Sequence, residues 1–208
     1  MSKIKGLIVD PTLRKAFRNK NSTNALFISI TGFMGSGKTT LSKTLAYYFQ
    51  EALGEKRAYL VPGNKALKVI KRLSPDWPEA DKDLIIIFDD ISYIIDSRSR
   101  EGKEALNRLF RIRHLTKKNV IAIFNMHYSR STAPFIRATP IRILTSLTEA
   151  EIPAYRSQYL FTVSTLWDYL YYIRHYPEKY IILTSIVGAE KIIDVTGEAK
   201  SPKGLKVL

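Results

Sequence analysis

The stretch FISITGFMGSGKTTLSKTL, residues 27–45, carries the most specific signal in this chain of 208 residues. Its centre, GFMGSGKT at residues 32–39, fits the pattern G-x-x-x-x-G-K-[ST]. An apolar, β-branched run at residues 26–30 precedes the pattern, and apolar residues at helical spacing follow from residue 38 onward. A strand, a glycine-rich loop and a helix in this order predict a loop that binds phosphate groups.

The residues of this loop have separate expected roles. We expect Gly32, Gly35 and Gly37 to allow backbone angles and close approaches that a Cβ atom would block. The Lys38 ammonium would contact the β- and γ-phosphates, and the Thr39 hydroxyl would bind Mg²⁺. The candidate nucleotide-binding residues are those of the loop and the first helical turn: Gly32, Phe33, Met34, Gly35, Ser36, Gly37, Lys38, Thr39 and Thr40.

The composition is that of one globular domain spanning residues 1–208, because 45% of the residues are hydrophobic. No apolar run approaches the roughly 20 residues that cross a membrane, so we expect a protein that is not itself transmembrane. Residues 1–15 lack the long apolar region of a signal peptide, which favours a soluble intracellular protein. The absence of cysteine excludes disulfides, thiolate metal sites and a cysteine nucleophile.

The charge is strongly positive, with 33 Lys and Arg against 19 Asp and Glu and a formal net charge of +14. Two segments concentrate it: residues 98–118 hold eight Lys or Arg and two Glu, and residues 1–20 hold six and one Asp. Such a balance favours a polyanionic partner, most often nucleic acid, although a merely solvated basic surface is the alternative. Residues 96–103, DSRSREGK, are a candidate DNA-facing loop.

Strand-like and helix-like segments alternate along the chain, which predicts an α/β fold with a mainly parallel sheet. Residues 191–195 can pair with the preceding strand as a hairpin, and residues 197–208 read as a loose tail. The expected strands are residues 26–30, 57–61, 84–88, 119–125, 141–145 and 180–186, and the expected helices are residues 38–53, 64–73, 100–114 and 164–175.

A second candidate site is acidic: Asp89 and Asp90 directly follow the apolar strand at residues 84–88. Ligands of parallel sheets bind at the carboxyl ends of the strands, so both carboxylates should lie near the phosphate loop. Asp89 would hold Mg²⁺, and Asp90 would orient or deprotonate a water molecule in line with the γ-phosphate. The alternative is that both residues only cap the following turn.

These motifs together resemble the additional-strand P-loop ATPases. In those proteins, the strand that follows the acid pair along the chain lies between the strand that carries the acids and the strand that precedes the phosphate loop. The segments LFRIRH at 109–114, NVIAIFNMH at 119–127 and APFIR at 133–137 are similar to those of viral genome-packaging ATPases of the FtsK–HerA superfamily. The compact members from archaeal icosahedral viruses with internal membranes are the nearest in size. The resemblance implies a RecA-like central sheet of order 5-1-4-3-2, flanked by helices and followed by a C-terminal hairpin.

The resemblance also implies a polar sensor residue at the tip of the inserted strand, facing the γ-phosphate. That residue is usually Gln in the family, whereas Asn125 and His127 occupy the tip here, and the sequence leaves the choice between them open. Ring motors of this kind complete each site with an arginine from the next subunit. The candidates are Arg108, Arg111, Arg113 and Arg137, of which Arg137 follows Pro134 in an expected loop.

The function implied by the resemblance is that of a motor that hydrolyses ATP with Mg²⁺ and translocates double-stranded DNA into a preformed capsid. The expected partners are DNA, further copies of the chain in a homo-oligomeric ring, and capsid or membrane components at the packaging vertex. The expected location is the cytoplasm of an infected cell, or the virion vertex.

Two alternatives remain. GFMGSGKTT also resembles small-molecule kinases such as shikimate kinase, although an acid that activates water would work against phosphoryl transfer to a metabolite. A P-loop protein that binds nucleotide only to regulate assembly would not need Lys38, Thr39 and both acids, all of which are present.

An aromatic stretch lies in the last expected helix, at residues 164–175. Leu166, Tyr169, Leu170 and Ile173 fall at helical spacing, which favours a face that packs on the sheet. The remaining aromatic residues of the stretch could stack on nucleic-acid bases instead.

Overall fold

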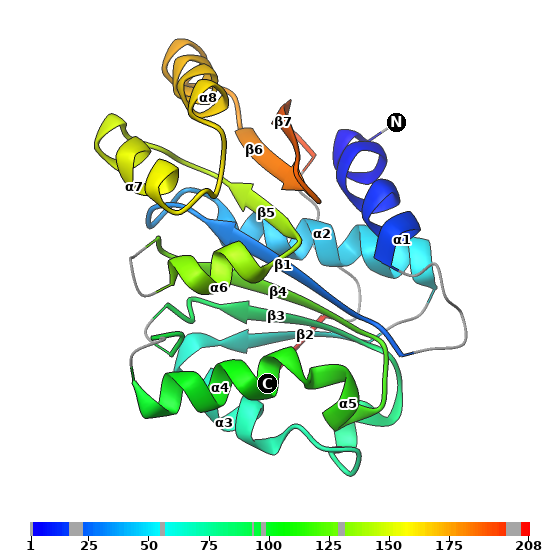
Figure 1. Cartoon of the computed structure of the whole chain (residues 1–208). Coiled ribbons are helices and arrows are strands. Elements are labelled where there is room, and N and C mark those ends of the chain that lie inside the picture. The colour runs from blue at the N-terminus through cyan, green and yellow to red at the C-terminus, as the bar shows by residue number, and fades with distance from the viewer. Residues whose placement is uncertain are drawn as a thin grey trace.

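The computed structural model describes residues 2–16, 23–54, 57–92, 94–96, 99–128, 132–198 and 205–208. The described residues form one eight-stranded sheet of order β7-β6-β5-β1-β4-β3-β2-β8, flanked by helices (Figure 1). The expected order 5-1-4-3-2 is its centre, extended by two strands at one edge and one at the other. No helix among the described residues is both long enough and apolar enough to span a membrane.

The five central strands run parallel, so their carboxyl ends meet at one edge of the sheet. The inserted strand β4 pairs with β1 on one side and with β3 on the other, as the resemblance implies. The strands are β1 (Ala25–Thr31), β2 (Arg57–Pro62), β3 (Leu84–Asp89), β4 (Val120–Met126), β5 (Ile141–Leu144), β6 (Ile181–Ile186), β7 (Ala189–Asp194) and β8 (Leu205–Val207).

The expected hairpin is present as β6 and β7, which pair antiparallel. Strand β6 also pairs antiparallel with β5, so the hairpin continues the sheet. Its turn consists of Val187 and Gly188, with φ angles of 51° and 87°. Positive φ at both central residues matches the turn that best follows the natural twist of a hairpin.

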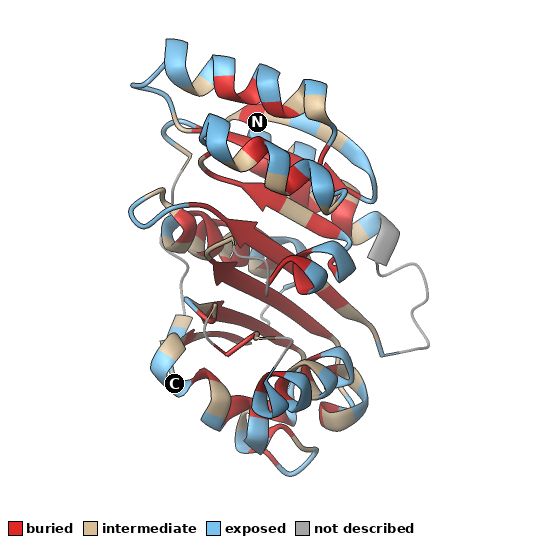
Figure 2. Cartoon of the chain, turned by 60° about the vertical axis from the view of Figure 1, so that its left-hand side comes forward, coloured by how far each residue is buried: buried red, intermediate tan, exposed pale blue. Residues whose placement is uncertain are grey.

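Alternate residues of the central strands face two separate cores, as the two-residue period of a strand requires. One core packs β1, β3 and β4 against α2 (Lys38–Leu53) and the N-terminal helical segment, η1 (Lys5–Val9) with α1 (Asp10–Ala16). Leu41, Leu45 and Phe49 of α2 are fully buried there. Figure 2 shows the central strands buried along nearly their whole length, while the helices expose their outer faces.

The remaining helices cover the opposite face of the sheet (Figure 1). Their core includes Phe88 of β3 and Phe124 of β4, whose rings stack 5.5 Å apart. These helices are α3 (Gly63–Arg72), η2 (Pro78–Asp81), α4 (Arg100–Phe110), α5 (Ile112–Thr116), α6 (Ala133–Ala138), η3 (Glu149–Glu151), α7 (Ile152–Ser157) and α8 (Val163–His175).

The structure contains helices that were not expected, α1, α6 and α7, and it differs from three specific expectations. The helix expected over residues 100–114 breaks at Arg111, so α4 and α5 are separate. The tail expected to be loose over residues 197–208 instead ends in β8, which pairs in parallel with β2. Arg137, expected in a loop, lies in the last turn of α6.

Candidate active site

The phosphate-binding loop connects β1 to α2 and is shaped by its glycines. Gly35 and Gly37 have φ angles of 79° and 82°, which residues with a Cβ rarely adopt. Gly32 is required for a different reason: a Cβ there would lie 2.2 Å from the Thr145 hydroxyl oxygen. Gly37 is also the N-cap of α2. The free amide groups at this helix end present partial positive charge at the loop, and no acidic side chain in the first turn offsets it.

Two hydroxyl residues just after β5, neither of them predicted from the sequence, contact the loop from the side. The hydroxyls of Ser36 and Thr145 lie 2.7 Å apart, and Thr145 also donates to the carbonyl oxygen of Thr31 at 3.1 Å. The backbone amide of Phe33 donates to the Ser146 hydroxyl at 2.8 Å. The available signal was their position, because polar residues at the carboxyl end of a strand beside β1 must lie next to the loop.

Lys38 is the buried cation of the loop, with only 8% of its surface exposed. Its ammonium donates to the carbonyl oxygens of Gly32 at 2.9 Å and Phe33 at 2.6 Å. Burial lowers the pKa of Lys38 from its ordinary value, and the negative charges of Asp90 and Asp89 act in the opposite direction. The structure therefore places the ammonium between the loop and the acid pair.

Asp89 is held by the residues that the sequence analysis assigned to the metal and the sensor. The Thr39 hydroxyl donates to Asp89 Oδ1 at 2.9 Å, and Asn125 Nδ2 donates to the same oxygen at 2.7 Å. Asn125 Nδ2 also lies 3.0 Å from the Ser42 hydroxyl of α2. Asn125 is completely buried, and its Oδ1 has no hydrogen-bond partner among the described residues. Loop, helix α2 and strands β3 and β4 are thus joined through one carboxylate.

The oxygens at this point suit a hard cation. Mg²⁺ prefers oxygen ligands and is commonly held by one or two carboxylates together with substrate phosphates and water. The Thr39 hydroxyl and the Asp89 carboxylate already lie within hydrogen-bond distance of each other beside the phosphate loop. Among the described residues, no group of three or more His, Cys, Asp and Glu side chains is placed so that it could hold a metal ion.

Asp90 has a different environment from its neighbour. Its backbone has a φ angle of 50°, and its side chain is 64% exposed. His127 Nε2 lies 3.8 Å from Asp90 Oδ1, and the His127 amide donates to the Ser92 hydroxyl at 2.6 Å. The Asp90 carboxylate therefore faces open space at the sheet edge, next to His127.

Gly63, the first residue of α3, fixes the backbone of the acid pair. A Cβ at Gly63 would lie 2.2 Å from the Asp90 carbonyl oxygen and 2.9 Å from that of Asp89. No substituent fits there without moving the chain that carries both carboxylates. Gly63 could not be predicted from the sequence, because nothing in the local pattern of a strand–helix junction shows which backbone it touches.

Arg111 and Arg113, two of the candidate arginines, lie away from the glycine-rich loop. Arg113 donates to the carbonyl oxygen of Thr23, which precedes β1 and so lies at the opposite edge of the sheet. Arg111 stands at the α4–α5 break, two residues before Arg113, and Arg137 is in α6. Arg108 has a structural role, because its guanidinium donates to three carbonyl oxygens at the end of α3, those of Ile70, Lys71 and Leu73.

Residues 97 and 98 of the candidate DNA-facing loop lie outside the described residues. From Arg100 onward that segment is helix α4, capped by the Ser99 hydroxyl, which accepts a hydrogen bond from the Gly102 amide.

No protein-family model matches this sequence, and no curated protein matches it. Among solved structures, the genome packaging NTPase B204 from Sulfolobus turreted icosahedral virus 2 in complex with AMPPCP has a TM-score of 0.55 at 13% identity, covering 81% of this chain and 96% of that one. The same NTPase in complex with ATP-gammaS has a TM-score of 0.53, covering 82% and 96%. B204 from Sulfolobus Turreted Icosahedral Virus, described as a DNA-packaging ATPase, has a TM-score of 0.50 at 14% identity, covering 80% and 95%. The chain therefore has the α/β fold of these viral genome-packaging NTPases.

Proposed function

We propose that this protein is an ATPase of the genome-packaging type, which hydrolyses ATP and uses the energy to translocate double-stranded DNA. The observation that carries the proposal is the Asp89 carboxylate, bonded to both Thr39 of the loop and Asn125 of the inserted strand. This arrangement links phosphate binding to the acid pair. The shared fold with packaging NTPases supports the same assignment.

Lys38, Thr39 and Asp89 would bind the substrate. The Lys38 ammonium would exchange its two carbonyl partners for β- and γ-phosphate oxygens. Thr39 and Asp89 would hold Mg²⁺, which when bound neutralises charge that develops on the phosphates. Asn125 would keep the Asp89 side chain in place, since its amide already donates to that carboxylate.

Asp90 would act as the base that orients and deprotonates the attacking water molecule, because its carboxylate is exposed and unbonded to the loop. His127, beside it, is the better candidate for the residue that senses the γ-phosphate. Asn125 is fully buried, and its amide nitrogen is already hydrogen-bonded to Asp89 and Ser42. The His127 side chain, in contrast, is 38% exposed.

An arginine acting within one chain does not fit the positions of Arg111 and Arg113 at the opposite edge of the sheet. We therefore propose that Arg111, Arg113 or Arg137 reaches the site of a neighbouring copy in a ring. Capsid or membrane components at the packaging vertex would be further partners, in the cytoplasm of an infected cell or in the virion.

Helix α3 is the best candidate for the DNA-binding surface. It contains no acidic residue, and Lys65, Lys68, Lys71 and Arg72 are all exposed. None of these four forms an ion pair with another described residue. Because α3 begins at Gly63, against the carbonyl oxygens of Asp89 and Asp90, a load on the helix would be transmitted to the hydrolytic residues.

The test is ATP hydrolysis by the full chain with Mg²⁺, with and without double-stranded DNA, at low and high salt. We expect turnover that rises with DNA and falls as salt increases, because phosphate contacts release counterions. A Lys38→Ala chain and an Arg113→Ala chain, each inactive alone, should recover activity when mixed if the arginine acts on a neighbour; Arg111 and Arg137 are tested in the same way. Turnover only on addition of a small phosphoryl acceptor would overturn the motor in favour of a kinase.

A further inference from the structure

Strand β7 is one edge of the sheet, so one side of its backbone has no strand partner among the described residues. The Val195 amide, just after the strand, donates to the Tyr180 carbonyl oxygen of the β6 side. Successive residues of an antiparallel pair point their backbone groups in opposite directions. In this register the odd-numbered residues of β7 bond to β6, and the N–H and C=O groups of Glu190, Ile192 and Asp194 point outward. Such an edge can pair with another extended chain.

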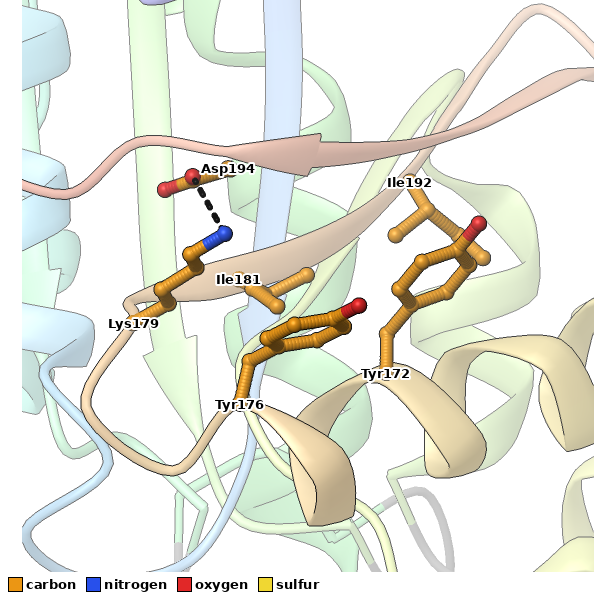
Figure 3. Close-up of a pocket in the computed structure, with 6 residues that line it drawn as sticks. All are labelled: Tyr172, Tyr176, Lys179, Ile181, Ile192 and Asp194. Atoms are coloured by element: carbon orange, nitrogen blue, oxygen red, sulfur yellow. Dashed lines mark ion pairs between the residues drawn. The ribbon is translucent and has the colours of Figure 1, made fainter.

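A cavity of about 320 Å³ lies between this edge and helix α8. Figure 3 shows the Tyr172 and Tyr176 rings of α8 turned toward β6 and β7, and the two rings stack 6.2 Å apart. At one end, the Lys179 ammonium lies 4.0 Å from the Asp194 carboxylate and 4.5 Å from the centre of the Tyr176 ring. We call this cavity, together with the outward side of β7, the edge groove. Its lining residues are Tyr172, Tyr176, Lys179, Ile181, Ile192 and Asp194.

The tyrosines of the edge groove are not needed for the packing of α8 on the sheet. Leu166, Tyr169 and Leu170 make that contact and are buried, whereas Tyr172 and Tyr176 are 43% and 39% exposed. Tyrosine is enriched at protein–protein interfaces and among the residues that dominate their binding energy. The exposed rings beside an edge strand therefore indicate a surface that binds protein.

The charge of this part of the chain differs from that of the rest. Residues 148–194 hold six Asp or Glu and four Lys or Arg, although the whole chain has 33 Lys and Arg against 19 Asp and Glu. The two Lys or Arg between residues 163 and 179 are each ion-paired. Asp168 and Glu178 form no ion pair with another described residue. The exposed face of α8 thus disfavours a polyanion such as DNA and favours a basic partner.

Asp168 extends the edge groove along α8. Side chains four residues apart form one row on a helix, so Asp168 lies one turn before Tyr172 in the row that leads to Tyr176. Lys179 already shows how this row holds a cation, because its ammonium lies over the Tyr176 ring and beside the Asp194 carboxylate. Tyr172 and Asp168 supply the same two elements, a ring and a carboxylate, for a second cation.

We propose that the edge groove binds an extended segment of a partner protein. The segment pairs with the outward backbone groups of Glu190, Ile192 and Asp194 as an additional strand. It places an apolar side chain in the cavity and an arginine or lysine side chain against Tyr172 and Asp168. In complexes of this kind, the backbone pairing gives affinity and the pockets for alternate side chains give specificity. The edge groove has no part in the proposed hydrolysis, so this inference does not rest on the proposed function.

The test uses two synthetic peptides in which threonine alternates with valine, one central residue and valine. The central residue is arginine in one peptide and glutamate in the other. Calorimetric titration of the full chain should show that the arginine peptide binds at least ~10-fold more tightly, because juxtaposed like charges oppose binding. Asp168→Lys should reverse this order. Asp76→Lys makes the same change of charge at an exposed position elsewhere and should keep the wild-type order.

Hydrogen exchange, followed by NMR, tests the strand pairing itself. The arginine peptide should slow exchange at the amides of Glu190, Ile192 and Asp194, which point outward. Exchange at Lys191 and Ile193 should stay as it is, because their amides are already bonded to β6.

Five outcomes would overturn the inference. Two concern affinity: neither peptide binds at ~1 mM, or both bind equally. A third is an unchanged order of affinity in Asp168→Lys. A fourth is binding of the arginine peptide without slower exchange at the outward amides. The fifth is a different occupant: displacement of the peptide by a short DNA duplex would assign the edge groove to nucleic acid, and slower exchange at the same amides as the chain alone is concentrated would assign it to a second copy.

Discussion

Asp89 and Asp90 are adjacent in the chain, yet they lie in two different halves of the site. Asp89 belongs to an interlocked half, hydrogen-bonded to Thr39 and Asn125, and Asp90 belongs to an open half, beside His127. Asp89 accepts hydrogen bonds from the loop and from β4, and the amide that holds it is completely buried. Asp90 leaves β3 with a positive φ angle and exposes 64% of its side chain. Under the proposed function this difference would divide the labour: the interlocked half, with Thr39, Asp89 and Asn125, would hold the nucleotide and its metal, and the open half, with Asp90 and His127, would meet water and a neighbouring subunit.

The largest expected effect concerns the cation of the interlocked half. Lys38→Ala should lower turnover by at least ~10³, because the change removes a buried charge that would contact the phosphates, and charges act most strongly where water is excluded. Steady-state phosphate release measures this. Lys43→Ala, a change in the same helix away from the loop, is the control and should retain wild-type turnover.

Asn125→Ala should affect both activity and folding, which distinguishes the interlocked half from the open one. The change removes one of the two donors to Asp89 Oδ1 and the amide bonded to the buried Ser42 hydroxyl, and it empties the space of a buried side chain, at about 1–3 kcal/mol of unfolding free energy. Turnover should fall by about 10²-fold, comparable to the loss of a positioned catalytic group. Urea unfolding and phosphate release test the two effects; a stable but inactive variant would contradict the structural role of Asn125.

Gly63→Ala should test whether the backbone position of Asp89 and Asp90 matters for hydrolysis. The added methyl would press on the carbonyl oxygens of Asp90 and Asp89 and force the acid pair to shift, at about 1–3 kcal/mol for overpacking. We expect turnover to fall by about 10-fold or more, since small misplacements of reacting groups are costly. Asn64→Ala, an exposed change at the next position, is the control. Wild-type turnover in Gly63→Ala would show that the position of the acid pair is not critical.

The smallest effect is expected on the outer surface. Lys68→Ala should leave turnover without DNA unchanged and lower the salt slope of DNA binding by about 1, the value for one phosphate contact. Binding isotherms of duplex DNA at several salt concentrations measure the slope. Lys82→Ala, which removes one exposed lysine after η2, controls for the loss of net charge. An equal change in both variants would mean that α3 is not the contact surface.

The sequence was sufficient for the parts of the fold that local patterns determine. The helix after the loop runs over Lys38–Leu53 as predicted, and the parallel order of the central strands follows from their alternation with helices. The acid pair lies beside the loop because both follow parallel strands of one sheet. These predictions needed only periodicity, glycine positions and the rule for strand ends.

What the sequence did not predict depends on contacts between distant segments. Gly63 and Thr145 matter because of the backbone or loop that each one touches, and no local pattern records such a partner. The break at Arg111 and the pairing of β8 with β2 are likewise set by packing in three dimensions. Of the aromatic helix, Leu166, Tyr169 and Leu170 are buried as expected, while Trp167, Tyr171, Tyr172 and Tyr176 are exposed.

The most direct test of the two halves is Asp90→Asn, measured for both Mg²⁺–ATP binding and hydrolysis, with Asp76→Asn as the control for an exposed aspartate. The division of labour predicts that Asp90→Asn binds Mg²⁺–ATP within about 3-fold of wild type and hydrolyses it at least ~10²-fold more slowly. Unchanged hydrolysis, or a loss of binding that parallels the loss of turnover, would contradict the claim that Asp90 serves hydrolysis and the interlocked residues serve binding.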